Sequence, residues 1–246
     1  MDHYGLIGNP VSHSLSEKYF TDKFTLEAID ARFERFLLKD ITSLPHILDA
    51  YPELKGLSVT SPFKEAVLPY CDKLGETAKK IKAVNTLKID HHNGVKSIMG
   101  FNTDVDGFAA ALLPIINESK VEALILGSGG AARAVAFALN KLGINYKVVS
   151  RSEGAGKIIY EQVDAPIMNS HKLIINATPL GMGKFIGLCP RLPYQHLTNK
   201  HTLFDLIYNP VETPFLAVGK KYNTRMENGL IMLQAQAEQA WNIWKA

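Results

Sequence analysis

The chain contains the stretch Glu122-Ala123-Leu124-Ile125-Leu126-Gly127-Ser128-Gly129-Gly130-Ala131-Ala132, in which a short apolar run enters a turn rich in glycine. The run Glu122–Leu126 predicts a buried strand, and the pattern over Ala131–Leu142, closed by Gly143, predicts a helix. The turn fits the pattern G-x-G-x-x-A, and a strand and a helix joined in this way open a βαβ unit. This stretch therefore predicts an α/β domain with a parallel sheet.

The small residues of this turn suit the binding of a pyrophosphate. Gly127 permits the tight turn, Gly129 lets backbone N–H groups approach the ligand, and Ala132 lets the helix pack closely on the strand. The amino end of the helix adds partial positive charge. Four residues are expected to hold the phosphates of a dinucleotide cofactor: Gly127, Gly129, Gly130 and Ala131. The alternative is a glycine-rich turn without a ligand, which any α/β protein can contain.

The regions on both sides of this unit alternate between strand and helix patterns. Further strands are expected at Tyr4–Ile7, Ala31–Phe36, Leu57–Val59, Thr86–Ile89, Ser97–Gly100, Asn145–Val149, Leu173–Asn176 and Leu203–Leu206. Further helices are expected from Ser16 to about Ala28, from Pro62 to about Tyr70, over Asp104–Ile116, over Thr213–Lys221 and from about Leu230 onward. We expect two α/β domains: an N-terminal domain with a mainly parallel sheet, and a Rossmann-like domain that contains the glycine-rich turn.

The composition limits the partners of the chain. Its 246 residues are 46% hydrophobic and 21% charged, which is typical of a globular protein, and its net charge is +3 with no basic stripe for nucleic acid. The apolar stretches are too short to cross a bilayer, and the N-terminus does not look like a signal peptide. Cys71 and Cys189 match no metal or redox spacing. We expect a cytoplasmic protein, monomer or homodimer, that binds small molecules and neither nucleic acid, membrane nor metal.

The end of the strand after the glycine-rich unit indicates which dinucleotide binds. An acidic residue there would bond the ribose 2′-OH of NAD, but the strand ends in Ser150-Arg151-Ser152. The guanidinium of Arg151 can pair with a 2′-phosphate, and Ser150 and Ser152 can add hydroxyl contacts. The sequence therefore favours NADP. Glu153 lies close by, and a solvated surface arginine is the alternative interpretation.

Polar residues outside this unit gather in four clusters, mostly at the ends of predicted strands, where open α/β sheets bind ligands. The clusters are Gly8–Ser16, Ser58–Lys64, Ala83–Thr86 and Gly100–Asp104. Their hydroxyls, amides, single amine and carboxylate suit a small polyhydroxylated substrate. Each residue also has a structural interpretation, because Ser14 or Ser16, Thr60 and Asp104 can cap helices and Asn85 can stabilise a turn.

The ordered set of motifs resembles the shikimate dehydrogenase family over nearly the whole chain. The motifs are Asn9-Pro10 with His13-Ser14-x-Ser16; Val59-Thr60-x-Pro62-x-Lys64; Ala83-Val84-Asn85-Thr86; Gly100-x-Asn102-Thr103-Asp104; Asn176-Ala177-Thr178-Pro179-Leu180-Gly181-Met182; Asp205-x-x-Tyr208-x-Pro210-x-x-Thr213-Pro214; and Met232-Leu233-x-x-Gln236-Ala237. The resemblance implies NADPH-dependent reduction of 3-dehydroshikimate to shikimate, a step towards chorismate and the aromatic amino acids. It also implies a substrate domain formed by residues 1–102 and completed by the helix 228–246, with an NADP-binding domain at 103–227 inserted between them.

The resemblance assigns roles to residues of this sequence. It implies that Lys64 and Asp104 assist proton transfer and contact the substrate, and that Ser14 and Ser16 bind the substrate carboxylate. The residues implied to complete the substrate site are Tyr208, at the carboxylate, and Thr60, Asn85 and Gln236, at the ring hydroxyls. The residues expected at the cofactor, besides the glycine-rich turn, are Ser150, Arg151, Ser152, Ala177, Thr178, Pro179, Leu206 and Gly229.

Three features depart from the family pattern. Glu17 stands where the family usually has proline, and Ser58 where it usually has asparagine. The segment between Arg151 and Leu173 is shorter than usual, so a strand or a helix can be missing there. Two alternatives stay open: a quinate or dual shikimate/quinate dehydrogenase that uses NAD or NADP, and a ligand-binding relative without catalysis.

The interpretation of Arg151 is testable by substitution. Arg151→Ala is expected to raise KM for NADPH by roughly tenfold or more and KM for NADH much less, because only NADPH carries the 2′-phosphate. Steady-state kinetics with both cofactors measure the difference. Equal effects on the two cofactors would exclude Arg151 from recognition of the 2′-phosphate.

Overall fold

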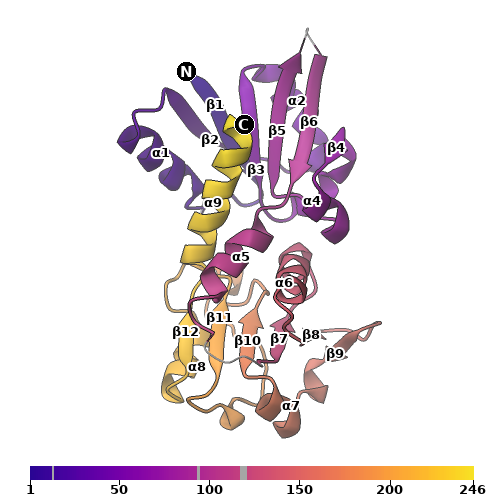
Figure 1. Cartoon of the computed structure of the whole chain (residues 1–246), viewed down its shortest axis with the longest axis vertical. Helices are drawn as coiled ribbons and strands as arrows, with labels where there is room; N and C mark the ends of the chain where they lie inside the picture. The colour runs from indigo at the N-terminus through magenta and orange to yellow at the C-terminus, as the bar shows by residue number, and fades with distance from the viewer. Residues whose placement is uncertain (13, 93–94, 117–120) are drawn as a thin grey trace. The chain divides into compact units, whose positions relative to one another are not determined.

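The computed structural model describes residues 1–12, 14–92, 95–116 and 121–246. Contacts divide the chain into two compact units, one formed by Met1–Thr103 with Gln236–Ala246 and the other by Asp104–Ala235. Each unit is built around a six-stranded sheet with helices beside it (Figure 1). The two-domain α/β class predicted from the sequence is confirmed. The assignment of residues 1–102 and 228–246 to the substrate, and of 103–227 to the cofactor, stays a prediction.

The first unit contains a mixed sheet with the strand order β2-β1-β3-β5-β6-β4. Its strands are β1 (Asp2–Gly8), β2 (Ala31–Leu37), β3 (Leu54–Val59), β4 (Lys73–Leu74), β5 (Thr86–His92) and β6 (Val95–Phe101). Strand β1 pairs in parallel with both β2 and β3, and β4 pairs in parallel with β6. Strand β5 is antiparallel to both of its neighbours. The described pairings are therefore mainly parallel, as expected.

Helices cover the first sheet, and the last helix of the chain seals part of its core. These helices are α1 (Ser16–Leu26), α2 (Leu44–Ala50), α3 (Phe63–Ala66), α4 (Glu76–Ile81) and α9 (Leu230–Lys245). The ring of Trp244 on α9 stacks on Tyr4 with centroids 5.0 Å apart, and its Nε1 donates to the carbonyl of Leu87 at 2.9 Å. Gly56 allows this approach, because a Cβ there would collide with the indole. The chain terminus is thus part of the N-terminal core.

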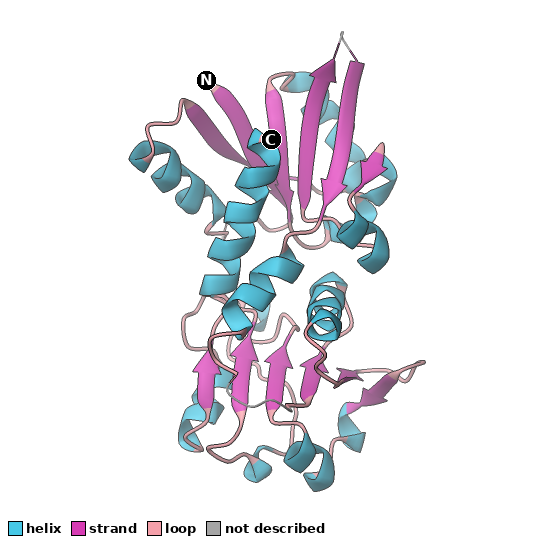
Figure 2. Ribbon diagram, viewed as in Figure 1, coloured by secondary structure: helices cyan, strands magenta, loops and turns pink. Residues whose placement is uncertain are grey.

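The second unit contains a sheet in which every described pairing is parallel (Figure 2). Its order is β12-β11-β10-β7-β8-β9, with β7 (Ala123–Leu126), β8 (Tyr146–Ser150), β9 (Lys157–Ile159), β10 (Leu173–Asn176), β11 (Thr202–Asp205) and β12 (Arg225–Glu227). Its helices are α5 (Asp104–Leu112), α6 (Gly130–Lys141), α7 (Ala165–Ser170) and α8 (Pro214–Lys221). The order of strand, glycine-rich turn and helix at residues 122–142 is the predicted one.

Two predicted helices are shorter than expected, and a proline explains each. The helix expected over Pro62–Tyr70 is only α3, Phe63–Ala66, followed by a 3₁₀ turn. Pro69 has no N–H to donate into the preceding turn, so the α-helix ends before it. The helix expected over Asp104–Ile116 ends at Leu112, because the residue before Pro114 is driven out of the helical conformation.

Other local expectations also need correction. Ser16 does not cap α1: it is the first helical residue, Leu15 stands at the cap position, and the Ser14 hydroxyl accepts from the Ser16 N–H at 3.2 Å. The sequence predictions did not include α2, α4, α7, β4, β9 or β12, all of which are short. The segment between Arg151 and Leu173 contains both a strand, β9, and a helix, α7, although it is shorter than usual in the family.

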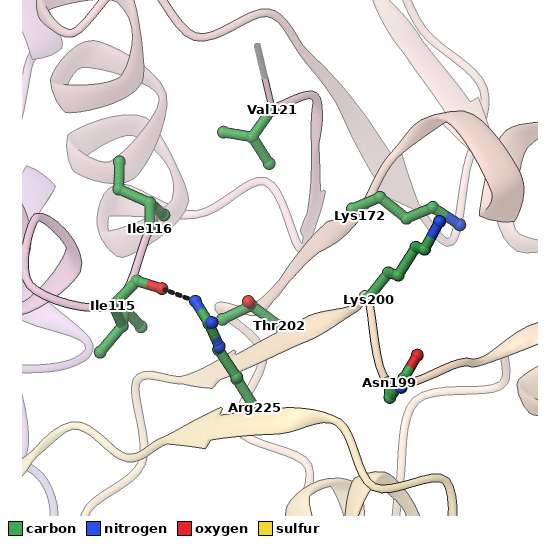
Figure 3. Close-up of a pocket in the computed structure, with 8 residues that line it drawn as sticks. All are labelled: Ile115, Ile116, Val121, Lys172, Asn199, Lys200, Thr202 and Arg225. Carbon is green, nitrogen blue, oxygen red and sulfur yellow. Dashed lines mark hydrogen bonds between the residues drawn. The ribbon is translucent and has the colours of Figure 1, made fainter. Parts of the chain in front are cut away.

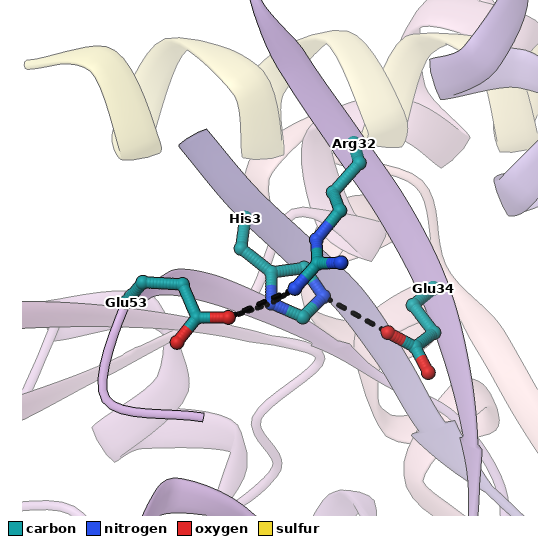
Figure 4. Close-up of polar contacts among 4 residues, drawn as sticks. All are labelled: His3, Arg32, Glu34 and Glu53. Carbon is teal, nitrogen blue, oxygen red and sulfur yellow. Dashed lines mark hydrogen bonds and ion pairs between the residues drawn. The ribbon is translucent and has the colours of Figure 1, made fainter. Parts of the chain in front are cut away.

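A polar cluster around the buried ring of His3 ties the amino-terminal part of the first sheet together (Figure 4). The ring of His3 on β1 is fully buried, with Nε2 3.1 Å from a carboxylate oxygen of Glu34 and Nδ1 3.0 Å from one of Glu53. Arg32 pairs with the same Glu53 oxygen at 2.9 Å. Both ring nitrogens of the buried His3 therefore have polar partners, whereas Glu34, Glu53 and Arg32 stay partly exposed. His3 lies near the amino end of β1, whereas the predicted polar cluster Gly8–Ser16 starts at its carboxyl end.

No helix in the described part of the chain is both long and apolar enough to cross a membrane. Among residues 1–12, 14–92, 95–116 and 121–246, no group of three His, Cys, Asp or Glu side chains is arranged to hold a metal ion.

His201 in the second unit provides a test of stability against pH. Its Nε2 bonds the carbonyl of Met168 at 2.9 Å and its Nδ1 accepts from the Thr198 N–H at 3.0 Å, which is the pattern of a neutral ring. Burial is the main cause that lowers the pKa of His201 below 6.5, and burial likewise lowers that of His171. At these two histidines the unfolded chain therefore binds more protons than the native chain below about pH 6.5, so their contribution to the free energy of unfolding falls as the pH decreases from there.

His201→Gln is expected to reduce this pH dependence between pH 7 and pH 5, measured by urea unfolding at several pH values. His46→Gln, at an exposed position, serves as the control. If the slope of unfolding free energy against pH were the same for His201→Gln and the natural protein, His201 would not be the group that causes it.

Candidate active site

The first two polar clusters meet at one edge of the first sheet. Strands β1 and β3 are parallel, so Gly8 and Val59 end them on the same side. The N–H of Thr60 donates to the carbonyl of Ile7 at 3.0 Å, and that of Asn9 donates to the carbonyl of Ser61 at 3.0 Å. The loops that follow the two strands are therefore fixed to each other.

The third and fourth clusters join the same edge through backbone hydrogen bonds. The N–H of Val59 donates to the carbonyl of Asn85 at 2.7 Å, and the N–H of Asn85 donates to the carbonyl of Phe101 at 3.0 Å. The N–H of Val84 donates to the carbonyl of Lys64 at 2.7 Å. Except for Asp104, which belongs to the second unit, the described residues of the four predicted clusters thus lie in the first unit.

Ser14 and Ser16 form a hydroxyl pair before and at the start of α1. The Ser14 hydroxyl donates to the Ser16 oxygen at 3.1 Å, and Ser16 is buried while Ser14 is half-buried. Both groups are neutral, so they can bond a carboxylate without a salt bridge. His13, which belongs to the same motif, lies outside the described residues.

An ion pair holds the loop that carries these serines. The carboxylate of Glu17 lies 2.8 Å from Nε of Arg35, and Nη1 of the same arginine donates to the carbonyl of Ser12 at 3.1 Å. Arg35 is on β2, so it attaches both sides of the serine loop to the sheet. Glu17, which departs from the family pattern, therefore has a defined structural role.

Asn85 organises a buried polar network around Thr103. Its Oδ1 accepts from the Thr103 N–H at 2.8 Å and from the Thr86 hydroxyl at 3.0 Å. Its Nδ2 donates to the Thr103 hydroxyl at 2.9 Å and to Oε1 of Gln236 at 3.3 Å. The structure thus brings together two predicted substrate residues, Asn85 and Gln236. It adds Thr86 and Thr103, which lay in the predicted clusters without an assigned role.

Thr60 and Lys64 belong to the turn and the short helix that follow β3. Thr60 is half-buried, and its carbonyl accepts from the Phe63 N–H at 3.0 Å. A Cβ on Gly8 would collide with the Thr60 methyl group, so the end of β1 fixes that side chain. Lys64 is half-buried on α3. Asp104, 4% exposed, begins α5 and belongs to the second unit.

The glycine-rich turn of the second unit has the backbone that a pyrophosphate requires. Gly127 has φ +109°, and a Cβ there would lie 2.9 Å from the carbonyl oxygen of Ala177. Gly129 stands at the cap of α6, and no atom lies within 4 Å of the position of a Cβ on it. Ala132 is buried against the sheet. The open approach to Gly129 and the amino end of a 12-residue helix fit a dinucleotide.

The residues predicted to select the cofactor lie at the end of β8. Ser150 is buried and its hydroxyl accepts from the Ser152 N–H at 3.3 Å, which shapes the turn. Arg151 and Ser152 are exposed. Since β8 is parallel to β7, these residues follow the same edge of the sheet as the glycine-rich turn.

The remaining cofactor candidates follow β10, β11 and β12. The carbonyl of Asn176 accepts from the Leu206 N–H at 3.0 Å, and its side-chain Oδ1 accepts from the Thr178 N–H at 3.1 Å. The Gly229 N–H donates to the carbonyl of Ile207 at 3.0 Å, and a Cβ on Gly229 would collide with the Leu206 carbonyl. Of the other cofactor candidates, Ala177 is half-buried and Pro179 is exposed, and Tyr208, predicted for the substrate carboxylate, is half-buried.

Three buried polar residues of the second unit, Asn176, Asp205 and Thr213, were named within the family motifs but were assigned no role of their own. The carboxylate of Asp205 accepts from the Asn176 amide at 3.0 Å and from the Thr213 hydroxyl at 2.6 Å. Burial raises the pKa of Asp205 to about 6, although these hydrogen bonds act in the opposite direction. The available signal was a polar residue at the end of an apolar strand, which occurs at both Asn176 and Asp205.

A cavity of about 270 Å³ lies elsewhere in the second unit (Figure 3). It is lined by Ile115, Ile116, Val121, Lys172, Asn199, Lys200, Thr202 and Arg225. Lys172 precedes β10, and Thr202 and Arg225 begin β11 and β12, so the cavity is at the amino edge of the sheet. None of the residues predicted for the site lines it.

Comparison with known proteins agrees with this arrangement. Residues 6–87 match the model of the shikimate dehydrogenase substrate binding domain. Over 98% of its length the chain is 36% identical to a Carboxydothermus hydrogenoformans protein described as shikimate dehydrogenase (NADP(+)), of which it covers 90%. The chain belongs to the shikimate dehydrogenase family.

Two solved structures show the range of this fold. Shikimate 5-dehydrogenase from Thermus thermophilus, in complex with NADP(H) and shikimate, is 32% identical with a TM-score of 0.86, over 99% of this chain and 93% of that one. A ligand-free 5-ketofructose reductase from Gluconobacter is 26% identical with a TM-score of 0.78, over 99% and 92%. The fold therefore occurs in proteins described as acting on different substrates.

The open position at Gly129 predicts a change in binding without a loss of stability. Gly129→Ala should leave the free energy of unfolding within about 1 kcal/mol of its natural value. It should raise Kd for NADPH roughly tenfold or more, because the methyl group would occupy the path of the pyrophosphate. Equilibrium fluorescence titration with NADPH measures the binding.

Gly154→Ala, at an exposed glycine whose Cβ would meet nothing closer than 3.8 Å, is the matched control and should leave Kd unchanged. Gly127→Ala should instead destabilise the fold, because of its positive φ and the Ala177 carbonyl. An unchanged Kd in Gly129→Ala would argue against phosphate binding at this turn.

Proposed function

We propose that this protein catalyses the reversible NADPH-dependent reduction of 3-dehydroshikimate to shikimate, a step in chorismate and aromatic amino acid biosynthesis. The observation that carries the proposal is the convergence of four hydroxyl-, amide- and amine-bearing segments at one edge of the first sheet. The same chain supplies a turn suited to a dinucleotide. Relatives described as NADP-dependent shikimate dehydrogenases share nearly its whole length.

We assign the two parts of the chain separate tasks within this reaction. Residues 1–102, completed by the helix 228–246, bind the substrate, and residues 103–227 bind NADP. The network of Asn85 with Gln236 supports this division, because it joins the last helix to the substrate clusters. The glycine-rich turn, Arg151 and the loop at Ala177–Pro179 all belong to the other part.

The nicotinamide, when bound, supplies the hydride to the substrate ring carbonyl or accepts it from the alcohol. Lys64 gives a proton to the oxygen that becomes the hydroxyl group, and takes it back in the reverse direction. Asp104 orients this exchange and accepts a hydrogen bond from the substrate hydroxyl. A single amine and a single carboxylate suffice for these tasks.

The other polar groups hold the substrate in register for hydride transfer. Ser14 and Ser16, with Tyr208, bond the carboxylate. Thr60, Asn85 and Gln236 bond the ring hydroxyls, and a site built in this way rejects analogues that lack them, since its buried polar groups would stay unpaired. The hydrogen bonds around Asn85 hold the Asn85 and Gln236 side chains in place before the substrate arrives.

We also propose contacts for the cofactor. Gly127, Gly129, Gly130 and Ala131 bond its pyrophosphate, and Arg151 binds the 2′-phosphate with help from Ser150 and Ser152. The loop residues facing the nicotinamide half are Ala177, Thr178, Pro179, Leu206 and Gly229. Cys71 and Cys189 are free thiols, in keeping with a cytoplasmic enzyme. The enzyme acts on small molecules, as a monomer or a homodimer.

Lys64→Ala is expected to lower kcat by roughly 10²- to 10⁴-fold in the oxidation of shikimate by NADP, because it removes the group that exchanges the proton. The absorbance of NADPH follows the reaction. Lys55→Ala provides the control, since Lys55 is an exposed lysine on β3 that pairs with Asp2 at 2.8 Å. A kcat for Lys64→Ala within about threefold of the natural value would remove Lys64 from this role.

A further inference from the structure

Asp205 is the last residue of β11 and has no exposed surface. Its Oδ2 accepts from the Thr213 hydroxyl at 2.6 Å. Its Oδ1 accepts from the Ile207 N–H at 3.0 Å and from the Asn176 amide at 3.0 Å. One buried carboxylate thus receives three donors.

These donors come from three separate segments of the second unit. Asn176 ends β10, Ile207 lies in the loop after β11, and Thr213 caps α8 by accepting from the Leu216 N–H. Asn176 in turn holds Thr178 in place, because its Oδ1 accepts from the hydroxyl of Thr178 at 2.6 Å. The orientation of the Asn176 side chain, and with it the loop at Thr178, therefore depends on the carboxylate of Asp205.

We propose that Asp205 is a positioning residue for the cofactor: it acts through Asn176 and Ile207 to fix the two loops that face the nicotinamide half of NADP. The proposal rests on the function proposed above for those loops. Asp205 itself needs no contact with the cofactor. Its effect is exerted on Ala177–Pro179 through Asn176, and on Leu206 through the hydrogen bond at Ile207.

A carboxylate suits this position better than an amide. Three donors point at its two oxygens, and an asparagine would offer one oxygen and turn an NH₂ group towards a donor. Burial raises the pKa of Asp205 to about 6, so the side chain is mainly ionised at neutral pH. Burial is the main cause that raises the pKa values of Tyr194 and Cys189, and the charge of Asp205 adds to both.

A role limited to stability is the competing explanation, because Thr213 caps α8 and any loss of that cap destabilises the helix. The two explanations differ in what they predict for binding. A purely structural Asp205 lowers the urea midpoint and leaves the affinity of the folded protein for NADPH unchanged. A positioning residue changes that affinity in the folded protein.

The test uses the full chain with Asp205→Asn, Thr213→Val and the conservative Thr213→Ser. Equilibrium fluorescence titration gives Kd for NADPH, and steady-state kinetics give KM for NADP and for shikimate. Asp205→Asn should raise Kd for NADPH by roughly 10- to 100-fold, because displaced loops no longer fit the cofactor. KM for shikimate at saturating NADP should rise by a smaller factor, because Tyr208 is the one proposed substrate residue in these loops, and Thr213→Ser should behave as the natural protein.

Thr213→Val removes one of the three hydrogen bonds and should raise Kd by a smaller factor than Asp205→Asn. If Asp205→Asn does not fold, Thr213→Val against Thr213→Ser decides the question. Unchanged Kd for NADPH in folded variants that have lost stability would overturn the proposal. A natural protein that binds NADPH but does not oxidise shikimate would instead contradict the proposed reaction, and the binding test of Asp205 would still apply.

Discussion

Parallel strand pairing is the constraint on which this protein depends. Since β10 pairs in parallel with both β7 and β11, the residues that end these strands are placed side by side. The same rule brings Gly8 and Val59 together in the first unit. The polar side chains of the site are therefore brought together without contacts of their own, because backbone hydrogen bonds between parallel strands place their loops side by side.

The features that were predictable from the sequence are those with a local physical cause. The turn at Gly127 was predictable because a positive φ and close packing against Ala177 require glycine between a strand and a helix. The premature ends of two helices were also visible in principle, since Pro69 and Pro114 each break the helical pattern. Short elements such as α2 and β12 carry too few residues for a clear periodicity, and their formation depends on packing.

In the candidate site too, some features were predictable from the sequence and others were not. The four polar clusters were predictable because three of them follow strands and Ala83–Thr86 leads into one, but the partners within them were not. Asn85 reaches a glutamine 151 residues away, and Asp205 bonds an asparagine 29 residues away. No sequence period links such pairs, because only the fold determines which donor meets which acceptor. Because Asp205 is buried at the end of β11, its carboxylate can bond the two loops that follow β10 and β11.

The most direct test of the account is the specificity of the natural protein, measured as kcat/KM from the absorbance of NADPH. Shikimate and quinate are each assayed with NADP and with NAD. The account predicts the highest kcat/KM for shikimate with NADP, because hydroxyl recognition and Arg151 select that pair. A higher value for quinate or for NAD, or no hydride transfer to either cofactor, would contradict it.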